Sequence, residues 1–143
     1  MIELLAPGGN KVKMKTAFEY GADAVYIGGD VFGLRANADN FTLDEIAEAV
    51  KYCHERDKKV YITVNIFAHN DDIEKLPPYL SALNEIGPDA LLISDPGVMM
   101  LAKEHAPNIP IHISTQAYNV NWKTVEFWKQ FGAERVVLGR ELS

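Results

Sequence analysis

Residues 21–41 read GADAVYIGGDVFGLRANADNF, a short apolar run that leads through a glycine pair into a long polar loop. Residues 87–94 (GPDALLIS) and residues 132–139 (GAERVVLG) repeat the first part of this pattern. Each copy has a glycine suited to the turn after a helix, then an acidic residue, a predicted strand and a small residue at the strand's end. Repetition of this kind predicts a chain of strand–helix units.

The rest of the chain alternates between short apolar runs and amphipathic stretches in the same way. Helix starts are marked by Asn10, by a capping box from Thr42 to Glu45, and by Asp95. Pro77 is expected, with the proline after it, to kink or restart its helix. The predicted strands are residues 2–6, 24–27, 59–64, 91–93, 111–114 and 135–138, and the predicted helices are residues 10–20, 42–56, 72–83, 96–105 and 121–131.

Alternating strands and helices fit either an open doubly wound sheet or a (β/α) barrel. An open parallel sheet is apolar on both faces, but residues 60–65 and 111–116 alternate between aliphatic and polar side chains. A barrel explains this, with aliphatic residues facing outer helices and polar residues lining the interior. A full TIM barrel has eight strands in about 250 residues. We therefore expect an incomplete α/β fold of TIM-barrel type, with about six parallel strands, in one domain spanning residues 1–143.

Composition is that of one globular domain: 143 residues, 48% hydrophobic and 24% charged. A net charge of −6 argues against a general nucleic-acid or anionic-membrane surface but leaves room for a local basic pocket. No apolar run approaches the roughly 20 residues that span a bilayer. A single cysteine excludes an internal disulfide and fits a reducing, cytoplasmic location.

Polar residues follow several predicted strands, where ligands bind in parallel α/β folds. Arg35 and Arg140 could hold a carboxylate or phosphate in bidentate fashion. Asp95 and Glu141 are the candidate catalytic acids or bases. The candidate side chains for orienting a polar substrate are Asn40, Asn65, Thr115 and Gln116. No metal site is predicted.

Each candidate also has a structural explanation. Asp95 precedes a proline and is expected to cap a helix more often than to catalyse. Arg140 could pair with Glu141 or with another carboxylate at a strand end and only tie the rim of the barrel together. Asn40 could bond its own loop backbone. The catalytic and structural roles remain open at this point.

Two further residue types give little support to nucleophilic or metal chemistry. Cys53 and His54 are neighbours on a predicted helix and point apart, so they do not form a nucleophile–base pair. His112 lies within a strand and is expected to be an interior residue. The sequence also lacks GxSxG, HExxH and CxxC, so it shows no protease machinery of its own.

Several ordered motifs together resemble the amino-terminal region of the U32 peptidase family, the collagenase-like proteases. They are ELLAPGG, GADAVYIGG, FGLRANADNF, VNIF, SDPGV, ISTQ and GREL, and they cover essentially the whole chain. The resemblance implies a barrel protein, and it falls on the same candidate site residues. It also implies a cysteine-rich region, with iron–sulfur ligands in some members, downstream of residue 143. Cys53 matches none of those cysteines, so no cofactor is expected in this chain itself.

The resemblance implies that the chain is the amino-terminal barrel fragment of a collagenase-like peptidase, inactive by itself. The first alternative is part of an oxygen-independent hydroxylation protein that acts on tRNA uridine. The second is a non-catalytic anion-binding or flavodoxin-like module. A peptide or RNA substrate is expected accordingly. Unpaired strand edges would also favour a homo-oligomer.

Overall fold

A computed structural model describes residues 2–32 and 40–142 of the chain. Strands and helices alternate through it, as the sequence predicts. The strands are β1 (Leu5–Pro7), β2 (Ala24–Gly28), β3 (Lys59–Val64), β4 (Ala90–Ile93), β5 (Ile111–Ile113) and β6 (Arg135–Val136). The helices are α1 (Lys11–Glu19), α2 (Leu43–His54), α3 (Asn70–Ile86), α4 (Pro96–His105), the short 3-10 helix η1 (Thr115–Ala117) and α5 (Trp122–Gln130).

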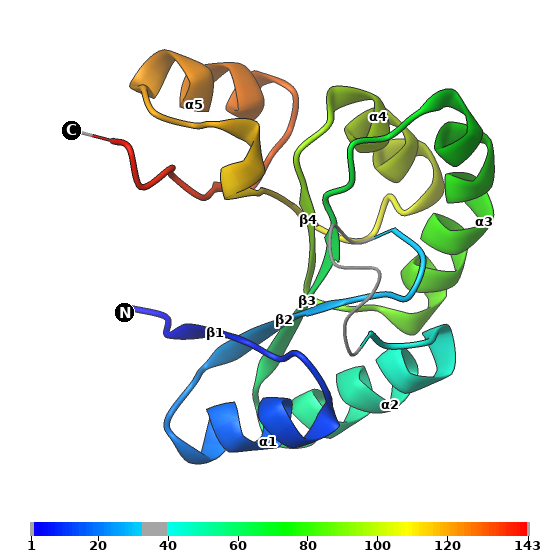
Figure 1. Cartoon of the computed structure of the whole chain (residues 1–143), viewed down its shortest axis with the longest axis vertical. Coiled ribbons are helices and arrows are strands. Elements are labelled where there is room, and N and C mark those ends of the chain that lie inside the picture. The colour runs from blue at the N-terminus through cyan, green and yellow to red at the C-terminus, as the bar shows by residue number, and fades with distance from the viewer. Residues whose placement is uncertain (1, 33–39, 143) are drawn as a thin grey trace.

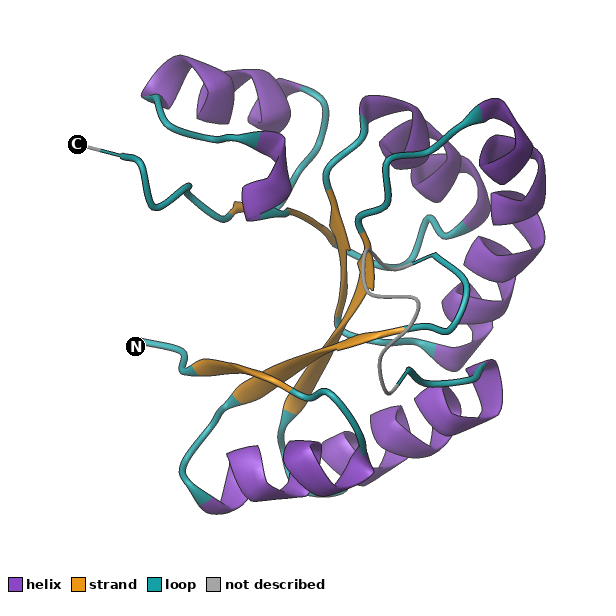
Figure 2. Ribbon diagram, viewed as in Figure 1, coloured by secondary structure: helices purple, strands orange, loops and turns teal. Residues whose placement is uncertain are grey.

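All six strands pair in parallel, and each lies beside the next in chain order, β1-β2-β3-β4-β5-β6. The sheet curls with the helices on its outer side, and both termini lie at its open side (Figures 1 and 2). A flavodoxin-like sheet has the order 2-1-3-4-5 instead. The strand order therefore confirms the incomplete TIM-barrel-like fold and rejects the doubly wound alternative.

Side chains of β3 alternate between the two sides of the curled sheet. Val60, Ile62 and Val64 are buried in the large core against the helices. Tyr61 points the other way and packs in a small interior cluster with Ala24, Ala90 and Leu92. The predicted alternation is confirmed, although the interior contains more apolar side chains than the polar residues of β3 and β5 suggested.

Most helix starts follow the predicted capping chemistry. In α2, Thr42 Oγ1 accepts from Glu45 N, and the Glu45 carboxylate accepts from Thr42 N, which completes the capping box. Asn10 and Asn121 cap α1 and α5 in the simpler way, with the side-chain oxygen accepting from the backbone three residues on. These caps set where each loop ends and each helix begins.

Helix α3 is longer than the sequence predicted, and it contains Pro77 and Pro78 rather than breaking at them. Proline removes a backbone donor from a helix interior, which normally costs about 3 kcal/mol. Here Leu76, Leu80 and Leu83 are fully buried on the inner face of α3. The burial of this leucine face offsets the loss and keeps one continuous helix. Every helix in the described part of the chain is too short or too polar to cross a lipid bilayer.

The two edge strands are shorter than predicted. Strand β1 begins at Leu5 rather than residue 2, and β6 ends at Val136 rather than residue 138. Each of them pairs with a single neighbour, β1 with β2 and β6 with β5. Because each edge strand has a neighbour on one side only, its outermost residues lack the second set of backbone hydrogen bonds that supports the central strands.

A polar cluster joins the first and last strands across the interior, at the amino end of the sheet. Glu3 Oε1 accepts hydrogen bonds from Tyr61 Oη at 2.8 Å and from Arg135 Nη1 at 2.6 Å. Glu3 Oε2 lies 3.4 Å from Lys59 Nζ. The His112 ring packs edge-on against Tyr61, with ring centroids 4.8 Å apart, so His112 is the interior residue that was predicted.

Candidate functional site

The carboxyl ends of the six parallel strands lie at one end of the half-barrel, opposite the Glu3 cluster. The loops that follow them contain most of the predicted site residues. Arg35 lies outside the described residues. The candidates that the structure places at this end are Asn40, Asn65, Asp95, Thr115, Gln116, Arg140 and Glu141.

Asn40 lies over the end of β2. Phe41 N donates to Gly28 O at 3.0 Å, and Asp30 N donates to Phe41 O at 3.1 Å, which fixes the returning loop against the strand. A Cβ on Gly28 would lie 3.2 Å from Thr63 Oγ1 and 3.5 Å from Asn40 Oδ1. The small residue at this strand end therefore lets polar groups of β3 and of the loop approach the backbone.

Asn65 and Ser94 follow the neighbouring strands β3 and β4. Ser94 Oγ donates to the carbonyl oxygen of Asn65 at 3.4 Å, so the two loops lie side by side. Asp95 comes next, and its Oδ1 accepts from Val98 N at 2.9 Å at the start of α4. The helix-cap role predicted for Asp95 is confirmed, and its catalytic role stays a prediction.

Thr115 and Gln116 form η1 directly after β5, and both are exposed. Ser114 caps this turn, and its backbone N–H donates to Ile93 O at 2.8 Å. Thr115 and Gln116 therefore stand at the strand ends, as the sequence predicted.

Asn119 is a buried anchor of this region that sequence reasoning missed. Its Nδ2 donates to Ser114 O and to Val137 O, each at 3.2 Å. Its Oδ1 accepts from Trp128 Nε1 at 2.9 Å. This one side chain thus ties β5, β6 and α5 together. An asparagine in a polar loop gives no sequence signal of burial, so nothing marked it.

Arg140 and Glu141 follow β6 and are exposed. Gly139 N donates to Asn119 O at 3.0 Å, which places the residue before Arg140 against the loop after β5. Among residues 2–32 and 40–142, no carboxylate lies within 4.0 Å of the Arg140 guanidinium. The rim-tying pair of Arg140 with Glu141 is therefore not formed within the described part of the chain.

Cys53 and His112, two of the groups with a perturbed pKa, lie away from these loops. Burial, and then the nearby Asp89 carboxylate, raises the pKa of the Cys53 thiol to about 12, so Cys53 is not a thiolate nucleophile at neutral pH. Burial, and then the nearby Arg135, lowers the pKa of His112. Within the described residues, no group of three or more His, Cys, Asp or Glu side chains could hold a metal ion.

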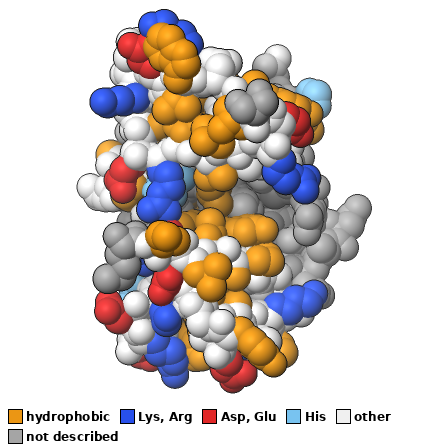
Figure 3. All heavy atoms as spheres, turned by 90° about the vertical axis from the view of Figure 1, so that its left-hand side faces the viewer, with side chains coloured by type: hydrophobic (Ala, Val, Ile, Leu, Met, Phe, Trp, Pro, Cys, Tyr) orange, Lys and Arg blue, Asp and Glu red, His pale blue; other side chains and the backbone are white. Residues whose placement is uncertain are grey.

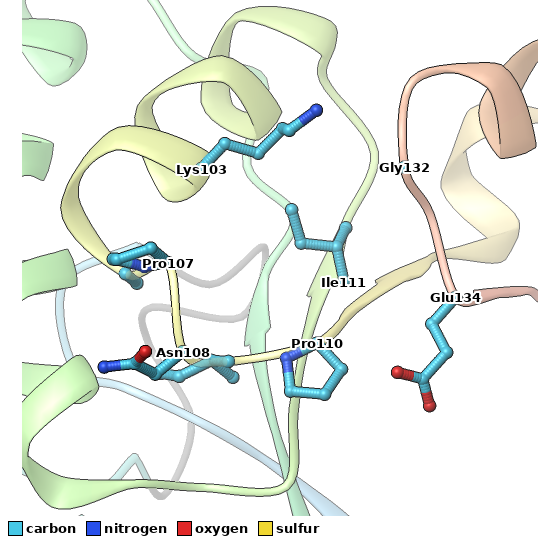
Figure 4. A pocket seen from close by; sticks show the side chains of 9 residues that line it. Lys103, Pro107, Asn108, Pro110, Ile111, Gly132 and Glu134 are labelled. Carbon is cyan, nitrogen blue, oxygen red and sulfur yellow. The ribbon is translucent and has the colours of Figure 1, made fainter.

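Two shallow hollows mark the surface. One of about 310 Å³ lies at the amino end of the sheet, between the end of α4 and the approach to β6 (Figure 4). Lys103 borders it, but Lys103 Nζ donates to Phe131 O at 2.8 Å and so stabilises the end of α5. The other hollow, of about 300 Å³, lies beside Asn40 and the starts of α1 and α2. Of the two, only the second adjoins the strand-end site.

The open side of the half-barrel carries exposed apolar side chains. Figure 3 faces this side and shows hydrophobic atoms gathered along its middle. The exposed large apolar residues of the described chain include Ile2 and Leu4 before β1, Tyr26 in β2 and Leu138 after β6.

Comparison with known proteins places these features in a family. The model of peptidase family U32 matches residues 9–143. The chain is 50% identical over 141 residues to tRNA hydroxylation protein P1 of Bacillus subtilis, covering 99% of this chain and 33% of that protein. It is 47% identical over 141 residues to tRNA hydroxylation protein P of Escherichia coli, covering 99% of this chain and 31% of that protein. The chain spans about a third of the length of these relatives.

A more distant relative and a solved structure extend the comparison. The 23S rRNA 5-hydroxycytidine C2501 synthase of Escherichia coli is 37% identical over 142 residues, covering 99% of this chain and 21% of that protein. The structure of the U32 peptidase Mk0906 superimposes with a TM-score of 0.77 at 16% identity, covering 96% of this chain and 58% of that chain. At this identity the superposition supports the fold alone.

These relatives correct one expectation. The sequence resemblance favoured a fragment of a collagenase-like peptidase that hydrolyses peptide bonds. That prediction is wrong, because the highly similar curated relatives are named for tRNA hydroxylation. The expected peptidase activity rested on the name of the family, and no protease motif in the chain supported it.

Proposed function

The chain belongs to peptidase family U32, and we propose that it forms the substrate-positioning half-barrel of a protein that hydroxylates uridine in tRNA. The observation that carries the proposal is identity of 50% and 47% to tRNA hydroxylation proteins across 99% of the chain. That span includes the loop after every strand. Because tRNA works in the cytoplasm, the proposal also keeps the expected cytoplasmic location.

The chemistry of the strand ends supports a base as the ligand. Uracil presents two carbonyl acceptors and one N–H donor along its pairing edge, and a carboxamide offers both complementary functions. Asn65 and Gln116 supply carboxamides after β3 and β5. Arg140 supplies a cation for a neighbouring phosphate. In this proposal these side chains bind and orient the nucleotide.

The residues of this chain do not fit an iron–sulfur cluster. Such clusters are held mainly by several cysteine thiolates, whereas the sequence has one cysteine. Cys53 is buried between α2 and the sheet, and its thiol is held protonated. We propose that any cluster in the working protein takes its ligands from outside residues 1–143.

The proposal is tested by deleting the gene and measuring the nucleosides of purified tRNA by mass spectrometry. We expect hydroxylated uridine to disappear and the wild-type gene to restore it. Arg140→Ala and Gln116→Ala should restore it at about a tenth of the wild-type level or less, in line with the loss of one positioning contact. Arg56→Ala is the matched control, because Arg56 is exposed at the far end of α2 and stacks on Tyr52. Unchanged tRNA in the deletion strain would refute the proposal.

A second candidate is hydroxylation of ribosomal RNA. It is favoured by the 37% identity to the 23S rRNA 5-hydroxycytidine synthase. The same deletion strain separates the two candidates if the nucleosides of 23S rRNA are measured in parallel. Loss of a hydroxylated cytidine from rRNA, with tRNA intact, would favour this candidate over the first.

A further inference from the structure

Two aromatic side chains stand exposed on the rim formed by the loops after β5 and β6. Tyr118 and Trp122 are each 73% exposed, although large aromatic residues bury most of their surface in folded proteins. Tyr118 follows η1 and Trp122 is the first residue of α5, so both lie at the same end of the half-barrel as Thr115 and Gln116. Their exposure calls for a partner that covers aromatic rings.

The backbone holds Tyr118 outward in a specific conformation. Tyr118 has a φ of 52°, in the left-handed region that residues with a side chain seldom adopt. Its N–H donates to Thr115 O at 3.0 Å, and the next residue is the buried anchor Asn119. Unusual backbone geometry of this kind concentrates at functional sites. The Tyr118 ring is therefore exposed from a hydrogen-bonded loop.

Two basic residues belong to this rim. Lys123 Nζ lies 4.7 Å from the centroid of the Trp122 ring and is ion-paired with the Glu126 carboxylate. Arg140 follows Gly139, whose N–H donates to the backbone oxygen of Asn119, the residue after Tyr118. Among the described residues, Arg140 has no carboxylate partner within 4.0 Å. In a chain with a net charge of −6, Arg140 is therefore the cation of this rim that is available to an anionic ligand.

We infer that the rim of Tyr118, Trp122 and Arg140 binds single-stranded RNA, with unstacked bases on the two rings and a phosphate on Arg140. Base stacking on aromatic side chains, with cations tracking the backbone, is how proteins hold unpaired nucleotides. The inference rests on the proposed function and identifies a tRNA-binding surface beside its site.

The test measures binding of an unmodified tRNA transcript to the protein expressed in full from its gene, by fluorescence anisotropy. Tyr118→Ala and Trp122→Ala should each weaken the affinity about tenfold, since one stacking contact is lost. Tyr118→Phe and Trp122→Phe retain an aromatic ring and should bind within about twofold of wild type. Tyr20→Ala is the matched control, because Tyr20 is 85% exposed at the end of α1, away from the rim.

Tryptophan fluorescence gives an independent readout. The chain has two tryptophans, and Trp128 is buried while Trp122 is exposed. Addition of tRNA should quench the fluorescence of the wild type more than that of Trp122→Phe. A duplex RNA without loops should quench neither protein.

The outcomes separate this inference from the proposed function. If the wild type binds tRNA and both alanine variants bind it equally well, the RNA-binding rim is refuted while the proposed function stands. If the wild type binds no tRNA, both are refuted. If the alanine variants bind tRNA normally but lose self-association in sedimentation, the rim is a protein interface and the inference is wrong.

Discussion

Glu3 shows how a single carboxylate can act on the whole half-barrel. Burial alone would raise the pKa of Glu3, but the hydrogen bonds from Arg135 and Tyr61 outweigh it and hold this pKa below its usual value of 4.5. The same environment, through burial and then the bond to Glu3, raises the pKa of the Tyr61 hydroxyl to about 12. At neutral pH, Glu3 is therefore ionised, Tyr61 is protonated, and Arg135 is a cation.

Glu3→Gln should lower the free energy of unfolding by about 1 kcal/mol at neutral pH. Hydrogen bonds to a charged group contribute about 1.5–3 kcal/mol, and the value is reduced here because the Arg135 side chain is 43% exposed. Because the pKa of Glu3 is lower in the folded state, its contribution is present above pH 4.5 and is lost as the pH falls through the folded pKa. Urea unfolding of wild type and variant at several values between about pH 3 and pH 7 measures the loss of stability and its dependence on pH. This range covers the titration of carboxylates.

The matched control is Glu48→Gln. Glu48 also forms a close ion pair, at 2.6 Å from Lys11 Nζ, but on an exposed helix face. Its removal should leave the unfolding curve almost unchanged. An equal loss of stability in the two variants would mean that the interior position of Glu3 has no special role.

Tyr79 gives a second prediction at this scale. Its hydroxyl is buried and has no hydrogen-bond partner among the described residues, and a Cβ on Gly29 would collide with it. Gly29→Ala should therefore lower stability by about 1–3 kcal/mol through overpacking. Tyr79→Phe should be neutral or slightly stabilising, and it should recover part of the loss in the double variant. Thermal unfolding of the four proteins in this cycle provides the measurement; purely additive effects would contradict the collision.

The residue scale is also where sequence reasoning reached least far. No local pattern pairs Glu3 with Arg135, because the two residues are 132 positions apart in the chain. Asn119 was missed because two of its partners are the residues directly after β5 and β6, and the third lies in α5. Such contacts depend on how separate strands are placed beside one another, which no local pattern encodes.

At the scale of single elements, α4 offers a test of Asp95. Asparagine caps helices about as well as aspartate, whereas alanine costs about 1 kcal/mol. Asp95→Asn should therefore unfold like the wild type, and Asp95→Ala should be less stable by about that amount. Chemical denaturation of the three proteins measures the difference.

The hydroxylation assay then separates the two roles of Asp95. If Asp95 only caps α4, Asp95→Asn should restore tRNA hydroxylation as fully as the wild type does. A stable Asp95→Asn protein without activity would show that the carboxylate is needed for catalysis. Thr42→Ala, which removes a cap from α2 away from Asp95, controls for loss of stability alone.

Elements were predicted best where several local signals agree. Strand β3 matches its predicted bounds, because a period-two pattern ends in a polar residue. The capping box of α2 likewise fixed its start. Helix α3 was misjudged because the leucine face outweighs the two prolines, and β6 because an edge strand depends on its neighbour. In both cases tertiary packing overrode the local signal.

At the scale of the whole molecule, β1 and β6 each leave one edge without a strand partner in the described structure. Exposed edges beside apolar surface favour pairing with another chain. Residues 1–143 expressed alone are therefore expected to self-associate, with an average mass in sedimentation that rises with concentration above the 15.9 kDa of one chain. Lysine at exposed Ile2 and Leu4 should weaken this association, while lysine at exposed Val12 of α1 should not. A monomer at every concentration would contradict the prediction.

The fold class could be predicted at this scale because a repeated strand–helix unit and side-chain alternation both favour a barrel. The strand order confirmed it. Function could not be predicted in the same way. The strand-end loops contain residues suited to several polar ligands, and it is similarity to relatives named for tRNA hydroxylation that argues against peptide hydrolysis.

The bond between Glu3 and Arg135 has a consequence for how the chain is made. Each strand pairs with the one before it, so every unit can dock as soon as it leaves the ribosome, at about 5–20 residues per second. Arg135 emerges from the ribosome 132 residues after Glu3. The Glu3 carboxylate is therefore exposed for several seconds before Arg135 has been synthesised and can bind it. Within this span the half-barrel can assemble vectorially, and the Glu3–Arg135 contact forms only once β6 begins to emerge.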